Sequence, residues 1–203
     1  LFTRSRKIFK GNDNFHKIIQ FTNFLKTSKK ISPLIWSDST DEAESNNKIK
    51  NEGPFIAVAP YSNWRQKDWS IEKYIELFKN DFFKNYTLIF TGISKDIPNK
   101  EKFNKLMNDP SLSIINLFDW GNLRHMIPIF KKCNFFIGSD SGLMHLAAST
   151  KCKTFALFGP TNEIVYGPWG DHKIIKSLDY PAIDDPLNLS VEKVLNVIKK
   201  EIE

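Results

Sequence analysis

Short, mostly apolar runs alternate with amphipathic segments along the chain from about residue 54 onward. Each run is apolar at consecutive positions, as strands buried on both faces of a sheet are. The runs lie at residues 55–59, 86–92, 112–118, 134–138, 154–159 and 172–177. Between them, apolar residues recur every three or four positions, which predicts helices near residues 70–80, 101–107, 123–132, 141–149 and 190–202. The alternation predicts an α/β fold with a doubly wound parallel sheet, but it does not predict the order of the strands.

The first 53 residues follow a different pattern, in which polar residues predominate. An amphipathic helix is predicted where apolar residues are spaced by three or four, at Phe15, Ile18, Phe21 and Leu25. Residues 37–53 contain few apolar residues and many turn-forming ones, so we expect a linker or exposed connection there, with room for a helix in its middle. The predicted domain boundary falls after residue 53, and residues 54–203 are expected to form one domain.

Composition and charge narrow the classes of function. The 203 residues carry a net charge of +6, which draws attention to nucleic acids and anionic lipids as partners. Only four of the 29 basic residues are Arg, the side chain that contacts phosphates and bases bidentately. We therefore interpret the basic charge as a solvated surface and expect no nucleic-acid partner.

The sequence gives no indication of a membrane span or of export. It has no apolar stretch near the roughly 20 residues that cross a bilayer, and no signal peptide opens it. The two cysteines, Cys133 and Cys152, have neither the spacing of metal ligands nor that of a disulfide framework. Both lie beside predicted core strands, so neither is expected to be a nucleophile. A reducing cytoplasm is the expected compartment.

Candidate chemistry gathers where the predicted strands end. In an open parallel sheet, ligands bind beyond the carboxyl ends of the strands, where loops lead into helices. Polar segments follow the first, second, fourth and fifth strands, at residues 60–69, 91–96, 139–142 and 158–162. We expect these four segments to share one edge of the sheet.

The sequence SDSG at residues 139–142 has the features of an anion site. A helix that begins at Ser141 and Gly142 directs free N–H groups and the positive end of its dipole outward, which favours a phosphate. Gly142 has no Cβ to block the approach. A phosphate would repel the carboxylate of Asp140, so we expect Asp140 to face neutral sugar hydroxyls. The alternative is that Asp140 or Ser141 only caps the helix.

Other side chains near these segments also have two interpretations. Lys67 is placed to neutralise a diphosphate, but it is equally a candidate for a solvated cation next to a core residue, Trp69. His145, in the first turn of the helix, is either part of the site or a core histidine that donates to a carbonyl. The sequence contains no metal-ligand cluster, Walker loop, Gly-x-Gly-x-x-Gly or Gly-x-Ser-x-Gly. We therefore expect no metal, and Ser141 is not predicted to be an acyl nucleophile.

Taken together, four motifs resemble the C-terminal half of glycosyltransferase family 9, which contains the ADP-heptose:lipopolysaccharide heptosyltransferases. They are KDW at 67–69, Thr91–Gly92 after a strand, DSGLMHLAAST at 140–150 and LFGPTN at 157–162. Each motif is weak alone, but they occur in the family's order over roughly residues 54–200. The resemblance implies the GT-B architecture of two Rossmann-like domains, with the donor nucleotide-sugar held by the C-terminal one.

The resemblance also implies a donor-binding set. Lys67 and the amides of Ser141 and Gly142 would contact the donor diphosphate, and Asp140 would bind sugar hydroxyls beside His145. The full set comprises Ser62, Lys67, Asp96, Asp140, Ser141, Gly142, His145 and Thr161. Transfer in this family inverts the sugar and needs neither a metal nor another cofactor.

Two further residues of the donor-binding set match the family pattern, and two positions of this sequence differ from it. Ser62 matches a position where small hydroxyl residues face the phosphates, and Asp96 matches an acid that meets the ribose. Cys152 stands where the family commonly has proline, and DWGN at 119–122 replaces a turn of small residues.

The family's N-terminal domain would carry the acceptor site and the carboxylate that acts as general base. Residues 1–53 are expected to be the tail of that domain plus the linker. Because the sequence begins with Leu1 rather than Met, we expect the working protein to be longer. The catalytic residues would then lie elsewhere, and this chain alone would be inactive in transfer.

The predicted function is a glycosyltransferase that moves a sugar from ADP-heptose or a related nucleotide-sugar to a lipopolysaccharide core or another glycan. We expect it in the cytoplasm, with peripheral contact to the inner membrane. The alternatives are a non-catalytic nucleotide-sugar binding module and another GT-B enzyme such as a sugar-nucleotide epimerase.

Overall fold

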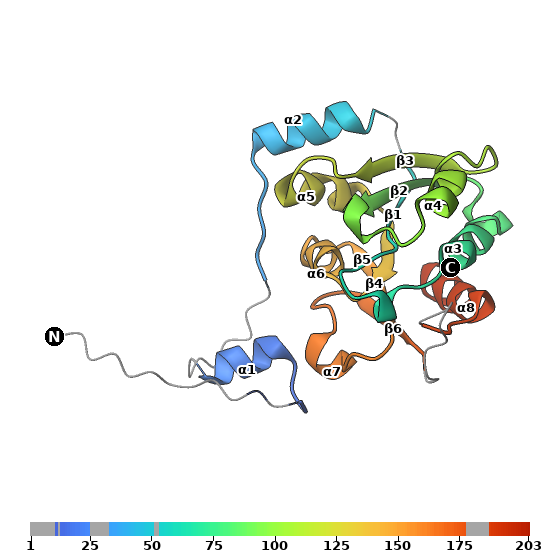
Figure 1. Ribbon diagram of the computed structural model, residues 1–203. Helices are drawn as coiled ribbons and strands as arrows, with labels where there is room; N and C mark the ends of the chain where they lie inside the picture. The colour runs from blue at the N-terminus through green and yellow to red at the C-terminus, as the bar shows by residue number, and fades with distance from the viewer. Residues whose placement is uncertain (1–10, 12, 25–32, 51–52, 178–186) are drawn as a thin grey trace.

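The computed structural model describes residue 11 and residues 13–24, 33–50, 53–177 and 187–203. Its centre is a six-stranded, all-parallel sheet in the order β3-β2-β1-β4-β5-β6 (Figure 1). The strands are β1 (Phe55–Ala59), β2 (Thr87–Gly92), β3 (Ser113–Phe118), β4 (Phe135–Ser139), β5 (Lys153–Phe158) and β6 (His172–Lys176). The chain winds outward from β1 to β3 and then returns to start again at β4. The predicted doubly wound parallel sheet is confirmed, and its switch point lies between β1 and β4.

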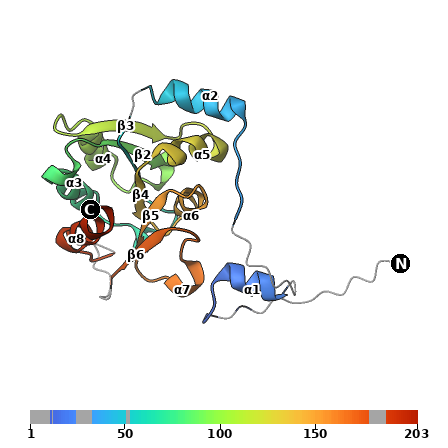
Figure 2. The same cartoon turned by 180° about the vertical axis from the view of Figure 1, so that it is seen from behind.

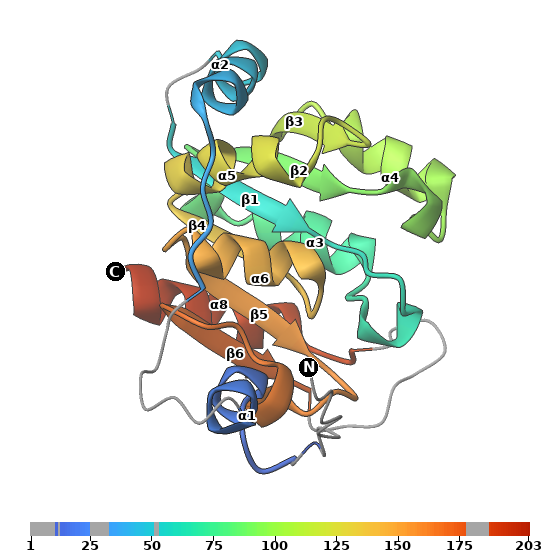
Figure 3. The same ribbon diagram turned by 90° about the vertical axis from the view of Figure 1, so that its left-hand side faces the viewer.

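Helices cover both faces of the sheet (Figure 3). One face packs against α3 (Ile71–Phe78), α4 (Lys100–Met107) and α8 (Val191–Ile202), and the other against α5 (Leu123–Lys132) and α6 (Gly142–Ser149). Each of these helices coincides with a predicted one, because its apolar positions recur at helical spacing. Among the described residues, no helix has the length and hydrophobicity needed to cross a membrane.

The strands are apolar at consecutive positions because both of their faces are covered. In β4, Phe135 and Ile137 belong to the cluster under α3 and α8, whereas Phe136 belongs to the cluster under α5 and α6. All three side chains are fully buried. The two-layer burial holds the carboxyl ends of the strands rigidly along one edge, where the predicted chemistry lies.

Residues 39–49 are mostly exposed, as their polar composition predicts, and only Asp41, Ser45 and Ile49 among them are buried. The segment forms α2 (Ser39–Lys48), capped by Asp38, so the helix in the middle of this segment is confirmed. Figure 1 shows α2 beside α5. The hydroxyl of Ser45 donates to the carbonyl of His125 at 2.7 Å, and Arg124 forms an ion pair with Asp41 at 2.7 Å. Polar contacts, rather than an apolar face, hold this helix in place.

The N-terminal helix α1 (Lys17–Phe24) lies beside the short helix α7 (Glu163–Tyr166), which the sequence did not predict (Figure 2). The predicted apolar face is only partly borne out, because Phe15 precedes the helix and is 48% exposed. Leu25 and the side chain of Phe21 lie outside the described residues. The contact with the α7 segment is polar: the Nε2 atom of His16 is 2.8 Å from the carbonyl oxygen of Gly167.

Candidate functional site

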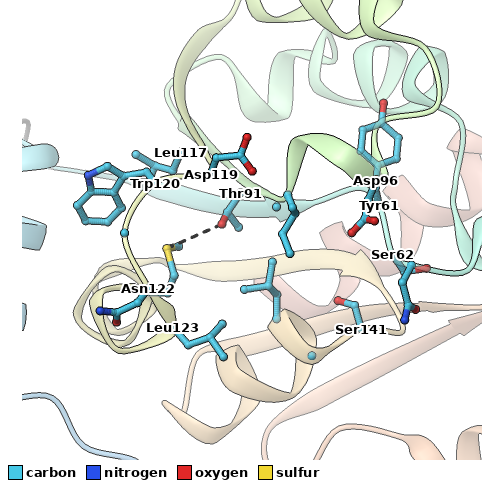
Figure 4. A pocket seen from close by; sticks show the side chains of 17 residues that line it. Tyr61, Ser62, Thr91, Asp96, Leu117, Asp119, Trp120, Asn122, Leu123 and Ser141 are labelled. Carbon is cyan, nitrogen blue, oxygen red and sulfur yellow. Dashed lines mark hydrogen bonds between the residues drawn. The ribbon is translucent and has the colours of Figure 1, made fainter.

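A cavity of about 590 Å³ opens at the carboxyl ends of β1, β2 and β3, next to the start of α6 (Figure 4). Four of the predicted site residues line it: Ser62, Asp96, Ser141 and Gly142. Figure 4 shows Ser62, Asp96 and Ser141 together on one side of the cavity, with Trp120, Asn122 and Leu123 on the other. The cavity therefore has a polar wall beside α6 and a more apolar wall beside α5.

The start of α6 presents free backbone donors to this cavity. Ser141 is the N-cap residue, but its side chain makes no capping hydrogen bond. Its hydroxyl oxygen is buried and has no hydrogen-bond partner among the described residues. The Asp140 carboxylate is turned toward other groups, so the interpretation of Asp140 or Ser141 as a mere cap is wrong. A Cβ at Gly142 would meet nothing within 4 Å, which leaves the first N–H groups of the helix open to an anion.

Gly138, which ends the apolar part of β4, is required for strand packing, whereas Gly142 leaves open space at the start of α6. A Cβ at Gly138 would lie 2.5 Å from the carbonyl oxygen of Ala59 in the neighbouring β1. The absence of a side chain lets β1 and β4 run close together at the switch point. This close approach brings the loop after β1 next to the start of α6.

A second cluster of predicted residues lies on the other side of the α6 start, outside the cavity. Lys67 Nζ is 2.9 Å from Asp140 Oδ2, and the Thr161 hydroxyl donates to the same oxygen at 2.8 Å. Asp140 is only 5% exposed, so this ion pair is largely shielded from solvent. Lys67 also lies over the ring of Trp64, 5.3 Å from its centroid. Lys67 is therefore not a solvated cation, so that alternative interpretation of Lys67 is wrong. Its other part is correct, because Trp69 is a fully buried core residue.

His145 stands at the edge of this second cluster. Its side chain is on the surface, so the interpretation as a core histidine is wrong. Partial burial lowers the pKa of His145, and the positive charges of His16 and Lys67 lower it further, against the opposing effect of Asp140. The lowered pKa favours the neutral imidazole, which has one donor and one acceptor nitrogen for hydroxyl groups.

Sequence reasoning missed the wall of the cavity that follows β3. Asp119, Trp120, Asn122 and Leu123 all line the cavity, and Met126 of α5 closes it. Asp119 Oδ1 accepts a hydrogen bond from the amide of Ser94 at 2.9 Å. The side chain of Ser94 and then its amide lower the pKa of the Asp119 carboxyl. The sequence could have indicated this wall. Ligands bind beyond the carboxyl ends of parallel strands, and this rule applies to the third strand as it does to the others.

The cysteines and the possible metal ligands add no further chemistry to the described part of this edge. Burial raises the pKa of the Cys152 thiol to about 12 and that of Cys133 well above its usual range, so both thiols stay protonated. In the part of the chain that the structure describes, no three His, Cys, Asp or Glu side chains are grouped closely enough to hold a metal ion. This edge therefore combines an open helix start, an ion pair and a partly apolar cavity.

Sequence comparison identifies relatives with a known activity. A model of glycosyltransferase family 9 (heptosyltransferase) matches residues 14–193. The lipooligosaccharide heptosyltransferase 2 of Haemophilus influenzae is 26% identical over 153 residues, which are 74% of this chain and 44% of that protein. The lipopolysaccharide heptosyltransferase 2 of Salmonella typhimurium is 28% identical over 138 residues, which are 64% of this chain and 40% of that protein. The chain thus spans less than half the length of these curated relatives.

Solved structures share the fold. The ADP-heptose lipopolysaccharide heptosyltransferase II of E. coli superposes with a TM-score of 0.72 at 21% identity, over 86% of this chain and 55% of that one. A glycosyl transferase family 9 protein from Veillonella parvula superposes with a TM-score of 0.80 at 19% identity, over 93% of this chain and 60% of that one. At such identities the likeness shows the fold alone, and it confirms the Rossmann-like α/β class.

Proposed function

The chain belongs to glycosyltransferase family 9, and from this premise we propose that it holds the donor nucleotide-sugar in the transfer of a heptose to a lipopolysaccharide-type acceptor. The main observation behind the proposal is that the open start of α6 lies between a cavity and a cluster of charged and polar side chains. On one side lies a cavity of about 590 Å³, and on the other lies the Lys67–Asp140–Thr161 cluster. A nucleotide-sugar has the matching order of parts: nucleoside, diphosphate and sugar.

In the proposed complex the diphosphate lies at the start of α6. The amides of Ser141 and Gly142 donate to it, and Lys67 turns from Asp140 toward its negative charge. The nucleoside occupies the cavity, with Asp96 near the ribose and Ser62 beside the phosphates. Loss of the Lys67 contact leaves Asp140 free to accept hydrogen bonds from sugar hydroxyls.

The sugar end of the proposed complex uses neutral as well as charged groups. Thr161 keeps its hydrogen bond to Asp140 and so holds the carboxylate in place after Lys67 has turned away. The neutral imidazole of His145 is available for a further hydroxyl. No residue of this set is assigned as the base that deprotonates the acceptor, and the proposed donor needs neither a metal nor a further cofactor.

The proposal also assigns different roles to the two parts of the chain. Residues 54–203 form the donor-binding unit, and residues 1–53 supply the tail of an acceptor-binding domain and a linker. The acceptor site and the catalytic base belong to that other domain. We therefore expect this chain alone to bind the donor and to transfer nothing.

The acceptor sets the expected location. A lipopolysaccharide core is the head of a glycolipid, so the enzyme would act from the cytoplasm at the inner face of the membrane. Leu34, Trp36 and Leu123 are exposed apolar side chains on the surface around α5 that would support such contact. Sedimentation with anionic lipid vesicles tests this part separately: pelleting supports it, and absence of pelleting at low salt contradicts it.

The test of the donor site uses Asp140 variants. Asp140→Ala is expected to weaken binding of ADP-heptose about tenfold more than binding of ADP, because only the former has the sugar that the carboxylate contacts. Asp140→Asn keeps one acceptor and is expected to fall between wild type and Asp140→Ala. Equal losses for ADP-heptose and ADP would contradict the sugar contact.

A further inference from the structure

The buried carboxyl group of Asp68 is tied to one end of the loop that follows β1. Its Oδ1 atom accepts a hydrogen bond from the amide of Ser62 at 2.8 Å and lies 3.2 Å from the Ser62 hydroxyl. Both residues are 6% exposed. The contact joins positions six apart in the chain, so it closes the loop into a ring.

Further bonds make this ring stiff. The Ser62 hydroxyl donates to the carbonyl of Trp64 at 2.9 Å, and the amide of Lys67 donates to the same carbonyl at 2.9 Å. Trp69, which follows Asp68, attaches the ring to the segment before α8, because its indole N–H donates to the carbonyl of Leu189 at 2.9 Å. These bonds restrain the loop and the separation of its two ends, Ser62 and Lys67.

These two ends serve the two halves of the proposed donor site. Ser62 lines the cavity, where Figure 4 shows it on the same side as Ser141. Lys67, at the other end of the ring, forms the ion pair with Asp140. Asp68 itself does not line the cavity, so any effect that it has on a ligand there passes through the loop.

Asp68 is an unfavourable choice for stability alone. Its second oxygen, Oδ2, is buried and has no hydrogen-bond partner among the described residues. A buried carboxylate with only one oxygen satisfied costs free energy, and a small polar residue could cap the ring without that cost. A contribution of Asp68 to ligand binding would account for the carboxyl group at this position.

We propose that Asp68 is a positioning residue of the donor site, which holds Ser62 and Lys67 at the separation that a nucleotide diphosphate requires. The inference rests on the proposed function, because it presumes that the site binds a diphosphate. It concerns a residue that makes no contact with the ligand and acts only through the loop.

The protonation of Asp68 adds a signature that a purely structural residue would lack. Burial raises the pKa of Asp68 to about 7, against the lowering effects of its bonds to Ser62 and of the nearby Arg65, while Asp96 raises it. Other titratable groups near it are the buried phenols of Tyr61 and Tyr74, and Glu72 and Lys102, which line the same small pocket as Asp68. Above pH 7 the carboxylate adds a negative charge behind the proposed diphosphate, so affinity is expected to fall as the pH rises.

The test compares Asp68→Ala, Asp68→Asn and the wild type, each titrated with ADP-heptose at pH 6 and pH 8. The diphosphate of this probe is esterified at both ends and does not itself titrate in that range. Asp68→Ala is expected to bind about tenfold more weakly at both pH values, because the ring is open. Asp68→Asn keeps the acceptor for the Ser62 amide, so it is expected to bind like the wild type at pH 6. It is expected to lose the part of the pH dependence that comes from Asp68, while the part that comes from His145 is common to both proteins. Asp81→Asn, in an exposed segment ahead of β2, is the matched control.

Wild-type affinity in Asp68→Ala, or equal weakening in Asp68→Asn and Asp68→Ala, would overturn the proposal. Hydrogen exchange of the Ser62 amide, measured without ligand, separates its failure from that of the proposed function. The amide is expected to be protected in the wild type and in Asp68→Asn but not in Asp68→Ala. If the wild type binds no nucleotide-sugar while this pattern holds, the proposed function fails and the control of the loop by Asp68 stands. If Ser62 exchanges equally in all three proteins, the positioning role fails.

Discussion

Lys67 and Asp140 form an ion pair that a ligand must rearrange. The pair is held at 2.9 Å in a largely shielded position, and Thr161 supports the carboxylate. A buried carboxylate that loses its cation is destabilised, whereas a diphosphate gains from the same cation. Lys67 therefore links the unliganded site to the proposed donor complex.

Replacement of Lys67 tests this link. Lys67→Ala is expected to weaken binding of both ADP and ADP-heptose about tenfold at low salt, because the diphosphate loses its nearest cation. The difference from the wild type is expected to shrink as salt is raised, since dissolved ions screen the attraction between Lys67 and the diphosphate. Titrations at low and high salt measure both effects, with Lys131→Ala, an exposed lysine of α5, as the control. Unchanged affinity for ADP in Lys67→Ala would remove Lys67 from the diphosphate site.

The raised pKa of Asp68 leads to a second prediction, which concerns how the free energy of unfolding depends on pH. The pKa of this carboxyl group is about 7 in the folded chain and near 3.8 in the unfolded chain, so folding favours the protonated form. The contribution of Asp68 is therefore most favourable below about pH 4, is lost as the pH rises to about 7 and stays lost above it. The full shift corresponds to about 4 kcal/mol.

Urea unfolding of the wild type and of Asp68→Asn at pH 5 and pH 8 measures this dependence. The variant is expected to be more stable than the wild type at pH 8, and the advantage is expected to shrink at pH 5. Comparison of the two proteins cancels the titration of every other group that they share. The same difference in unfolding free energy at both pH values would mean that Asp68 does not titrate in the folded chain as described.

At the scale of an element, the β4–α6 unit contains two glycines with opposite roles. Gly138→Ala is expected to destabilise the chain by about 1–3 kcal/mol, because its Cβ would meet the Ala59 carbonyl oxygen at 2.5 Å. Gly142→Ala is expected to leave the unfolding free energy within about 0.5 kcal/mol of the wild type, since its Cβ enters open space. Its effect falls on binding, where the added methyl group narrows the approach to the amides of α6.

Urea unfolding of both variants, followed by titration of Gly142→Ala with ADP, checks the pair. Weaker binding with unchanged stability is the expected result for Gly142→Ala. Wild-type affinity in that variant would show that no ligand approaches the start of α6 closely.

The elements differ in how far the sequence predicted them. The strands and the helices on the two faces of the sheet were predicted well because buried parallel strands are apolar throughout, as β4 is. The helix α2 lacks an apolar face and is held by polar contacts such as that of Ser45 with His125, which periodicity does not detect. The face expected for Phe15 failed for a related reason, because α1 begins only at Lys17.

The residues of the site were predicted more completely than their contacts. The motifs identified Lys67 and Asp140 separately, but their ion pair joins positions 73 apart in the chain. It depends on β1 and β4 being neighbours, which requires the strand order that a hydrophobic pattern does not contain. The wall formed by Asp119 and Trp120 required only the rule already used for the other strand ends.

For the whole molecule, the strand order β3-β2-β1-β4-β5-β6 creates the site. The chain reverses its direction of winding between β1 and β4, and ligands bind at such switch points. Here the loop after β1 meets the start of α6, as the contact of Lys67 with Asp140 shows. The cavity lies toward β2 and β3, and the Lys67–Asp140–Thr161 cluster lies on the other side of the α6 start. The proposed donor, an elongated ligand with an anionic centre, would extend across the α6 start from one region to the other.

Calorimetric titration of this 203-residue chain with ADP-heptose, ADP and UDP tests the central claim most directly. We expect saturable binding of ADP-heptose that is tighter than binding of ADP, because the sugar adds contacts at Asp140. Comparison of ADP with UDP then measures how strongly the cavity selects the base. Absence of binding for all three ligands, or binding of ADP-heptose no tighter than binding of ADP, would contradict the claim that this chain holds the donor nucleotide-sugar.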